Sequence, residues 1–71
     1  MKNKIKLSVV IPVLNEGANL KVLLPILKSA INARHEVLVV YVIPDDNSIP
    51  VVKAMQKKYP GLGLVHNKLG R

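Results

Sequence analysis

Carboxylate and amide side chains are concentrated in two short segments of the chain, 12–19 and 43–48. Three of the four acidic residues lie in these segments, and Glu36 is the exception. Carboxylates accept hydrogen bonds from ribose hydroxyls and base N–H groups, while amides both accept and donate. We therefore interpret the two segments as candidate parts of a nucleoside-binding site. The candidate side chains are Asn15, Glu16, Asp45 and Asp46.

The same residues have a second interpretation, because they lie where helices are expected to begin. Asn15 or Asn19 precedes the first predicted helix. Asp46 or Ser48 precedes the second, and all four residue types cap helix N-termini. A phosphate cradle is not indicated, because segment 12–17 holds one glycine where a dinucleotide fingerprint needs three, and no Walker-type loop occurs. Binding through base and ribose and simple helix capping both remain open from the residues alone.

The elements that must position these side chains are short apolar strands. The segments Leu7–Val13 and Glu36–Val42 are apolar on both faces, and Leu62–Val65 is a weaker third strand. Strands without polar alternation are typical of a parallel sheet that is covered on both faces. Ligands bind beyond the carboxyl ends of such strands, so the two polar segments and 66–71 should meet at one edge.

Two helices are predicted between the strands. The first carries an apolar stripe at helical spacing, in which Pro25 either kinks the helix or marks its true first turn. The second has Ser48 as a candidate cap and should stop before Pro60. The stripe of the first helix is Leu20, Leu23, Leu24, Leu27 and Ile31, and the inner face of the second is Val52, Met55 and Tyr59.

This order of elements predicts an α/β fold, a βαβαβ Rossmann-like half domain. Right-handed crossovers would give three parallel strands in the order 3-2-1 with two helices on one face. The other face would stay apolar and uncovered, and the first strand would be an exposed edge. We expect residues 1–71 to be a single incomplete domain of poor thermal stability. The remainder of a larger domain, or a self-associating copy, would cover it.

Composition excludes several other classes of protein. The 71 residues include 11 Lys+Arg and 4 Asp+Glu, giving a net charge of +7; 49% are hydrophobic and none is cysteine. Disulfides and thiolate zinc sites are excluded, and His35, interpreted as an ordinary loop residue, cannot hold a metal with His66 alone. The apolar content argues against disorder, and no apolar run reaches the ~20 residues of a membrane span. Pro12 argues against a signal peptide. The lack of cysteine fits a reducing cytosol at least as well as a secreted protein, so composition leaves the compartment open.

The positive charge allows a different class of partner. Lysines cluster in segments 2–6 and 53–58, where they would attract nucleic acid or an anionic membrane surface. The chain has two tyrosines and no recognition helix, so we expect no specific nucleic acid. Peripheral association with a membrane remains compatible with the charge.

Two motifs resemble the start of the family 2 glycosyltransferases. The first is Ser8–Glu16, SVVIPVLNE, and the second is Val39–Ser48, VVYVIPDDNS. The resemblance covers nearly the whole chain and is closest to dolichyl- or polyprenyl-phosphate sugar transferases. It implies that the chain is the N-terminal part of a GT-A domain. Such enzymes transfer a hexose from a nucleotide-sugar donor to an acceptor such as a polyprenyl phosphate, here at the cytoplasmic face of a membrane.

The resemblance also implies roles for residues in the first and third polar segments. Pro12, Asn15 and Glu16 would line the pocket for the nucleotide of the sugar donor. Lys68 and Arg71 follow the third strand, where relatives often carry basic residues near the nucleotide.

The second motif departs from the family pattern. Asp46 and Ser48 would occupy its acidic and hydroxyl positions, but Val42 falls where a carboxylate is expected, and Asp45 would compensate. In the family a D-x-D motif holds a divalent cation, Mg or Mn; no D-x-D occurs here, so the chain has no metal ligands and no catalytic residue of its own. Alone it should be inactive. The alternative is a non-catalytic fragment that binds a nucleotide, or a basic one that binds nucleic acid or a membrane surface.

Overall fold

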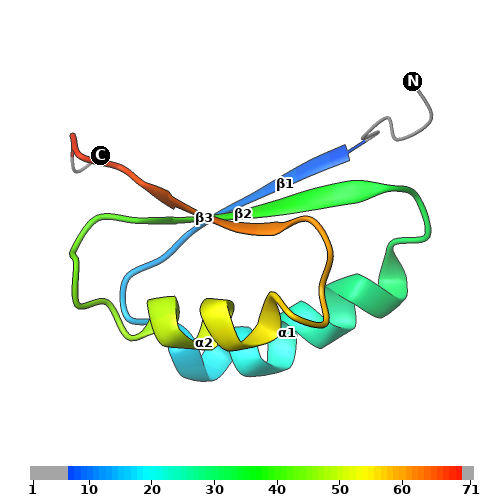
Figure 1. The fold of residues 1–71 in the computed structure, drawn as a ribbon, viewed down its shortest axis with the longest axis horizontal. Coiled ribbons are helices and arrows are strands. Elements are labelled where there is room, and N and C mark those ends of the chain that lie inside the picture. The colour runs from blue at the N-terminus through cyan, green and yellow to red at the C-terminus, as the bar shows by residue number, and fades with distance from the viewer. Residues whose placement is uncertain (1–6, 70–71) are drawn as a thin grey trace.

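The computed structural model describes residues 7–69, which form one parallel sheet with helices along one side (Figure 1). The predicted α/β class, with three parallel strands and two helices, is confirmed. The elements in chain order are β1 (Leu7–Pro12), α1 (Gly17–Ala30), β2 (His35–Tyr41), α2 (Ser48–Met55) and β3 (Leu62–His66).

β2 is the central strand of the sheet, because the order is β1-β2-β3 and both neighbours pair with it. Val39 of β2 lies opposite Ile11 of β1 and Leu64 of β3, in parallel register on both sides. Parallel neighbours need a crossover connection, and α1 and α2 provide one each. All three strands therefore end at the same side of the sheet, which we call the carboxyl edge.

Both helices lie on the same face of the sheet, below it in Figure 1, and enclose the core there. Leu20 and Leu24 of α1, Val52 of α2 and Val37 and Val39 of β2 are each at most 1% exposed. Burying an aliphatic side chain of this size contributes about 1.5–3 kcal/mol, so these few contacts hold the helices on the sheet.

α1 is one continuous helix with Pro25 inside it. Pro25 therefore does not mark the first turn, which was one of the two predicted alternatives. The predicted apolar stripe is only partly buried, since Leu23 is 38% exposed and Ile31 lies beyond the end of the helix. No helix in the described part of the chain has the length and apolar character needed to cross a bilayer.

α2 is shorter than predicted and ends at Met55, not near Tyr59. The N–H of Lys58 donates to the carbonyl of Met55 at 3.0 Å, a three-residue bond that tightens the chain after the helix. The residue before a proline disfavours helical geometry, which explains why the helix does not reach Pro60. Tyr59 is nevertheless 4% exposed, so its predicted place in the core is correct although its secondary structure is not.

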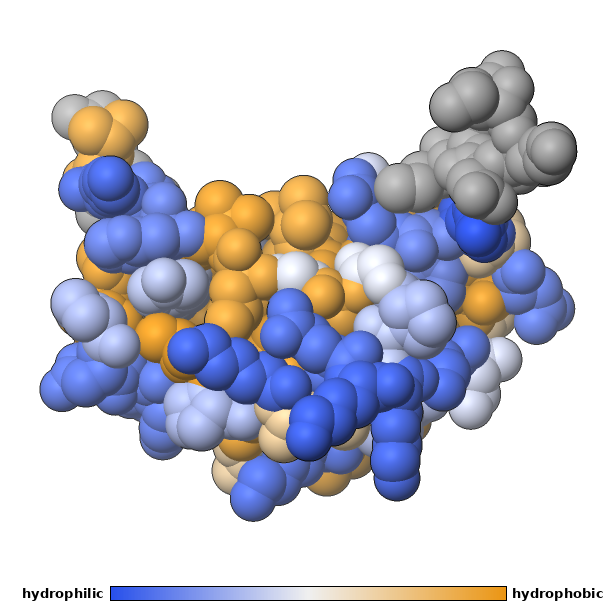
Figure 2. Space-filling model, in the orientation of Figure 1, coloured by the Kyte–Doolittle hydropathy of each residue, from blue (hydrophilic) through white to orange (hydrophobic). Residues whose placement is uncertain are grey.

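The second face of the sheet, here called the open face, is covered by neither helix. Val10 is 59% exposed and Val65 41%, and Leu38 and Val40 between them are half-buried. Figure 2 shows the resulting apolar patch along the upper side of the molecule, where the sheet lies in Figure 1. The apolar character of both strand faces thus predicted the bare face correctly.

Candidate functional site

The loops that follow β1 and β2 are tied to each other at the carboxyl edge. Three consecutive backbone N–H groups, of residues 15–17, donate to side chains of three consecutive residues, 46–48. The bonds are Asn15 N–H to Asp46 Oδ1 and Oδ2 at 3.1 and 3.0 Å, Glu16 N–H to Ser48 Oγ at 2.8 Å, and Gly17 N–H to Asn47 Oδ1 at 2.8 Å.

Two local features let the loops approach this closely. Asn15 has a φ of 53°, in the left-handed region that asparagine tolerates better than most residues, and its Oδ1 accepts from the N–H of Asn47 at 3.0 Å. Gly17 has no side chain to obstruct the contact. A Cβ at this position would lie 2.7 Å from the carbonyl oxygen of Asn47, closer than such atoms can come.

Asp46 is the centre of this junction and is 1% exposed. Its Oδ1 also accepts from the N–H of Ser48 at 2.7 Å. Burial would raise the pKa of Asp46, but hydrogen bonds from the backbone N–H groups of Ser48 and Asn15 and from the Ser48 hydroxyl hold the pKa below its usual value. The carboxylate therefore stays charged while it serves these donors.

The capping interpretation describes what Asp46 does, but not what Ser48 does. Asp46 accepts from the N–H of Ser48 at the start of α2 and also from the N–H of Asn15. Ser48 is the first residue of α2, and its Oγ accepts from the N–H of Glu16 in the other loop. Ser48 is fully buried. These two candidates lie in the wall of the site, and their bonds fix the two loops relative to each other.

The candidates that remain accessible at this edge are Pro12, Asn15, Glu16 and Asp45. Pro12, Asn15 and Asp45 are exposed, and Glu16 is half-buried. One oxygen of Glu16 accepts from Nδ2 of Asn19 at 2.6 Å. The structure therefore brings two accessible carboxylates, one from each loop, to the edge predicted from the strand order.

The chain after β3 joins the same edge. Lys68 is exposed, and Arg71 lies outside the described residues. Nε2–H of His66 donates to the carbonyl of Val42 at 2.9 Å, and the His66 ring stacks on Tyr41 with centroids 4.8 Å apart and planes 9° apart. Val42 is 38% exposed and offers no hydrogen-bonding side chain at the position where the resemblance predicts a carboxylate.

Sequence reasoning missed three residues that shape this edge. Asn47 was not singled out although it stands between two candidates, and Gly17 was noted only as the lone glycine. Tyr41 was not linked to His66, although β2 and β3 in register put the two residues side by side. The contacts of these three residues join segments about 25 to 30 residues apart. Spacing rules apply within a single helix or strand, so they do not predict such contacts.

The described residues do not fit the divalent cation that the resemblance implies. No group of three or more His, Cys, Asp or Glu side chains among residues 7–69 is placed to hold a metal ion. The N–H groups of residues 15–17 at the start of α1 are also taken by side chains, so they are not free to bind a phosphate there. What the described part of this edge offers a ligand is the accessible oxygens of Glu16 and Asp45, which accept hydrogen bonds.

Comparison of the chain with protein-family models, with curated proteins and with solved structures gave no match.

Proposed function

We propose that this chain is the nucleotide-binding part of a glycosyltransferase with a GT-A fold. It would receive the nucleoside of a nucleotide-sugar whose hexose passes to an acceptor such as a polyprenyl phosphate, at the cytoplasmic face of a membrane. The observation that carries the proposal is the junction of the β1–α1 and β2–α2 loops, which holds an accessible carboxylate from each loop at the carboxyl edge. The two motifs of the family lie in these same loops.

The site would bind through hydrogen bonds that carboxylates accept. Glu16 and Asp45 would accept from ribose hydroxyls or from N–H groups of the base, and Pro12 would offer an apolar contact. Because cross-loop bonds already fix the backbone of both loops, little ordering cost would remain on binding. The role proposed for the described residues is binding, and no bond-breaking step is assigned to them.

A titration followed by NMR amide shifts tests this proposal. The probes are uridine and guanosine, which carry no phosphate and so report the carboxyl edge alone. We expect saturable shifts in residues 14–19 and 43–48. Glu16→Gln and Asp45→Asn should each weaken binding by about fivefold or more, since each removes a charged acceptor.

Glu36→Gln is the matched control, because this fourth carboxylate lies on the open face and accepts from the hydroxyl of Ser8. Its affinity should equal that of the wild type. Binding that is unchanged in both Glu16→Gln and Asp45→Asn would reject the proposal. A hexosyl-transfer assay on a protein containing this segment separates a transferase from a non-catalytic nucleotide-binding protein.

A further inference from the structure

The outer side of the two helices faces away from the sheet and forms a second exposed surface, here called the helix surface. It carries the exposed residues Lys21, Val22 and Ile26 of α1 and Lys53 of α2, together with Lys57 just after α2. In Figure 1 this surface is the lower side of the molecule, away from the open face. The helix surface is thus separate from both the open face and the carboxyl edge.

The helix surface carries charge of one sign. Residues 17–30 and 48–60 contain five lysines and no acidic residue. Among residues 7–69, Lys21, Lys53 and Lys57 form no ion pair. Their charges therefore act on whatever approaches this side of the molecule from solution. The five lysines, all exposed, are Lys21, Lys28, Lys53, Lys57 and Lys58.

The four acidic residues lie elsewhere. Asp46 is buried in the junction of the two loops, and Glu16 and Asp45 lie at the carboxyl edge. Glu36 accepts from the hydroxyl of Ser8 on the open face. Figure 2 shows that the half of the molecule that holds the helices is largely hydrophilic, in contrast with the apolar patch above it.

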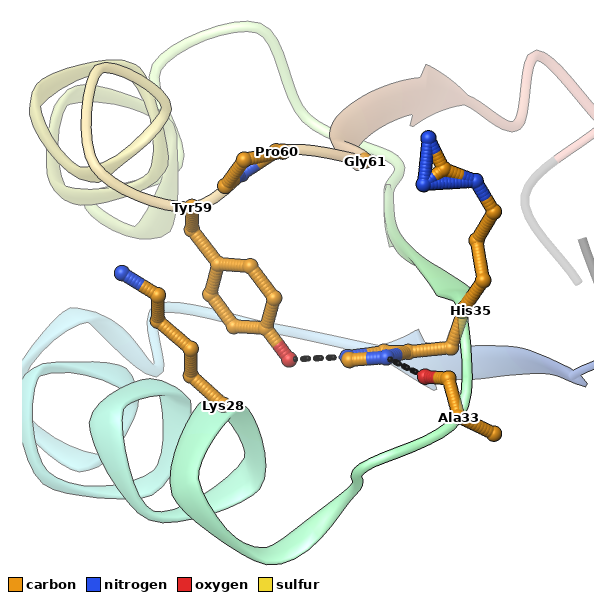
Figure 3. Close-up of a pocket in the computed structure, with 7 residues that line it drawn as sticks. Lys28, Ala33, His35, Tyr59, Pro60 and Gly61 are labelled. Carbon is orange, nitrogen blue, oxygen red and sulfur yellow. Dashed lines mark hydrogen bonds between the residues drawn. The ribbon is translucent and has the colours of Figure 1, made fainter. Parts of the chain in front are cut away.

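The two helices hold their lysines in a fixed arrangement. The Nζ of Lys28 keeps its charge while it donates to the carbonyl of Lys58, which joins the C-terminal part of α1 to the turn after α2. Figure 3 shows Lys28 extending from α1 toward that turn, beside Tyr59. Tyr59 is held in turn, because its hydroxyl donates to Nε2 of His35 at 2.7 Å. The lysines of both helices therefore belong to one continuous surface.

Two aliphatic side chains protrude from α1 among these lysines. Val22 is 65% exposed and Ile26 57%, one helical turn apart. They lie on the side of α1 opposite Leu20 and Leu24, which are buried against the sheet. Basic side chains beside exposed aliphatic ones are typical of helices that lie in the plane of a membrane interface.

We propose that the helix surface docks on a membrane that contains anionic phospholipids. The negative potential of such a membrane attracts lysines, and each lysine near it strengthens binding by about fivefold. Val22 and Ile26 would enter the boundary between headgroups and acyl chains. The inference rests on the proposed function only in that it brings a transferase to a lipid-linked acceptor, and its test contains no nucleotide.

Sedimentation of the full chain with lipid vesicles tests the helix surface. At about 0.1 M salt, we expect binding to phosphatidylcholine vesicles with about 30% phosphatidylserine and no binding to phosphatidylcholine alone. Lys53→Gln and Lys57→Gln should each weaken binding by about fivefold. Ile26→Ser should weaken it by about threefold or more, because it removes an aliphatic side chain from the interface.

Lys68→Gln and Val10→Ser are the matched controls. Lys68 is an exposed lysine that follows β3, and Val10 is 59% exposed on the open face, close to the value for Ile26. Each control should change binding by less than about twofold, because charges more than about 10 Å from the membrane are screened at this salt concentration. Circular dichroism of every variant separates loss of the surface from loss of the fold.

Absence of binding to the acidic vesicles, or equal binding to both kinds of vesicle, would overturn the proposal. So would binding that neither Lys53→Gln nor Lys57→Gln reduces. Binding that is lost in Val10→Ser and kept in Ile26→Ser would also overturn it, since the contact would then be the open face. Stronger binding to duplex DNA than to the acidic vesicles, unaffected by Ile26→Ser, would assign the lysines to nucleic acid instead. None of these results depends on the nucleoside titration, so the two proposals fail separately.

Discussion

Asp46 is the residue on which the junction of the two loops most depends. Its buried carboxylate accepts from the N–H groups of Asn15 and Ser48, and hydrogen bonds to a charged acceptor contribute about 1.5–3 kcal/mol. Asp46→Asn keeps the shape but replaces one acceptor with a donor that faces another donor. We expect it to lower the free energy of unfolding at neutral pH by about 2 kcal/mol, measured by urea denaturation. Asp45→Asn, at the exposed neighbouring position, should change it by less than about 0.5 kcal/mol.

The wild type and Asp46→Asn should also differ in how the free energy of unfolding depends on pH. Because the folded-state pKa of Asp46 is lowered below 3.8, the unfolded chain takes up the proton first as the solution is acidified. The stabilisation is therefore fully present above the unfolded pKa and is lost as pH falls through the folded pKa. The difference in the free energy of unfolding between wild type and Asp46→Asn should be constant near neutral pH and should narrow as the pH falls below the unfolded pKa of 3.8. A difference that stays constant below that pKa would contradict the assigned role of the charge.

At the scale of elements, the approach of α1 to α2 depends on Gly17. A Cβ at this position would lie 2.7 Å from the carbonyl oxygen of Asn47 and 3.2 Å from a methyl group of Val51, so α1 would have to move. Gly17→Ala should lower the free energy of unfolding by about 1–3 kcal/mol, although alanine is the better helix former. Gly63→Ala is the matched control in thermal unfolding, because its Cβ would make only an ordinary 3.6 Å contact with Leu38. Equal melting temperatures for the two variants would refute this account.

The elements also show what the sequence could and could not predict. Both strand faces of β1 and β2 are apolar, and this pattern alone predicts a parallel sheet and hence a shared carboxyl edge for the polar loops. The end of α2 at Met55 was not predicted, because Tyr59 continues the apolar spacing of the helix. Tyr59 is indeed buried, but it lies in the segment that follows the helix. The hydrogen bonds between residues 15–17 and 46–48 could not be predicted from the residue types. They join side chains to the backbone of another loop, and backbone donors carry no residue-specific signal in the sequence.

At the scale of the whole molecule, charge and apolar surface are segregated. The carboxyl edge carries three of the four acidic residues, Lys28 and Arg34 lie at the opposite end, and the open face carries exposed Val10 and Val65. Figure 2 shows the apolar patch of the open face. A contiguous apolar surface of this kind is unfavourable in water, and in a purified solution a second copy is the only protein available to cover it.

The purified chain should therefore self-associate through the open face. We expect its mass by sedimentation equilibrium to rise above 7.8 kDa with concentration, because burying each valine side chain contributes about 1.5 kcal/mol or more. Replacing Val10 and Val65 together with lysine should keep the chain at its monomer mass, since each interface would then bury charge. Val22→Lys is the control, because Val22 is 65% exposed on α1, away from the sheet. A wild-type chain that stays monomeric at all concentrations, or one that Val22→Lys dissociates equally well, would show that the open face drives no association.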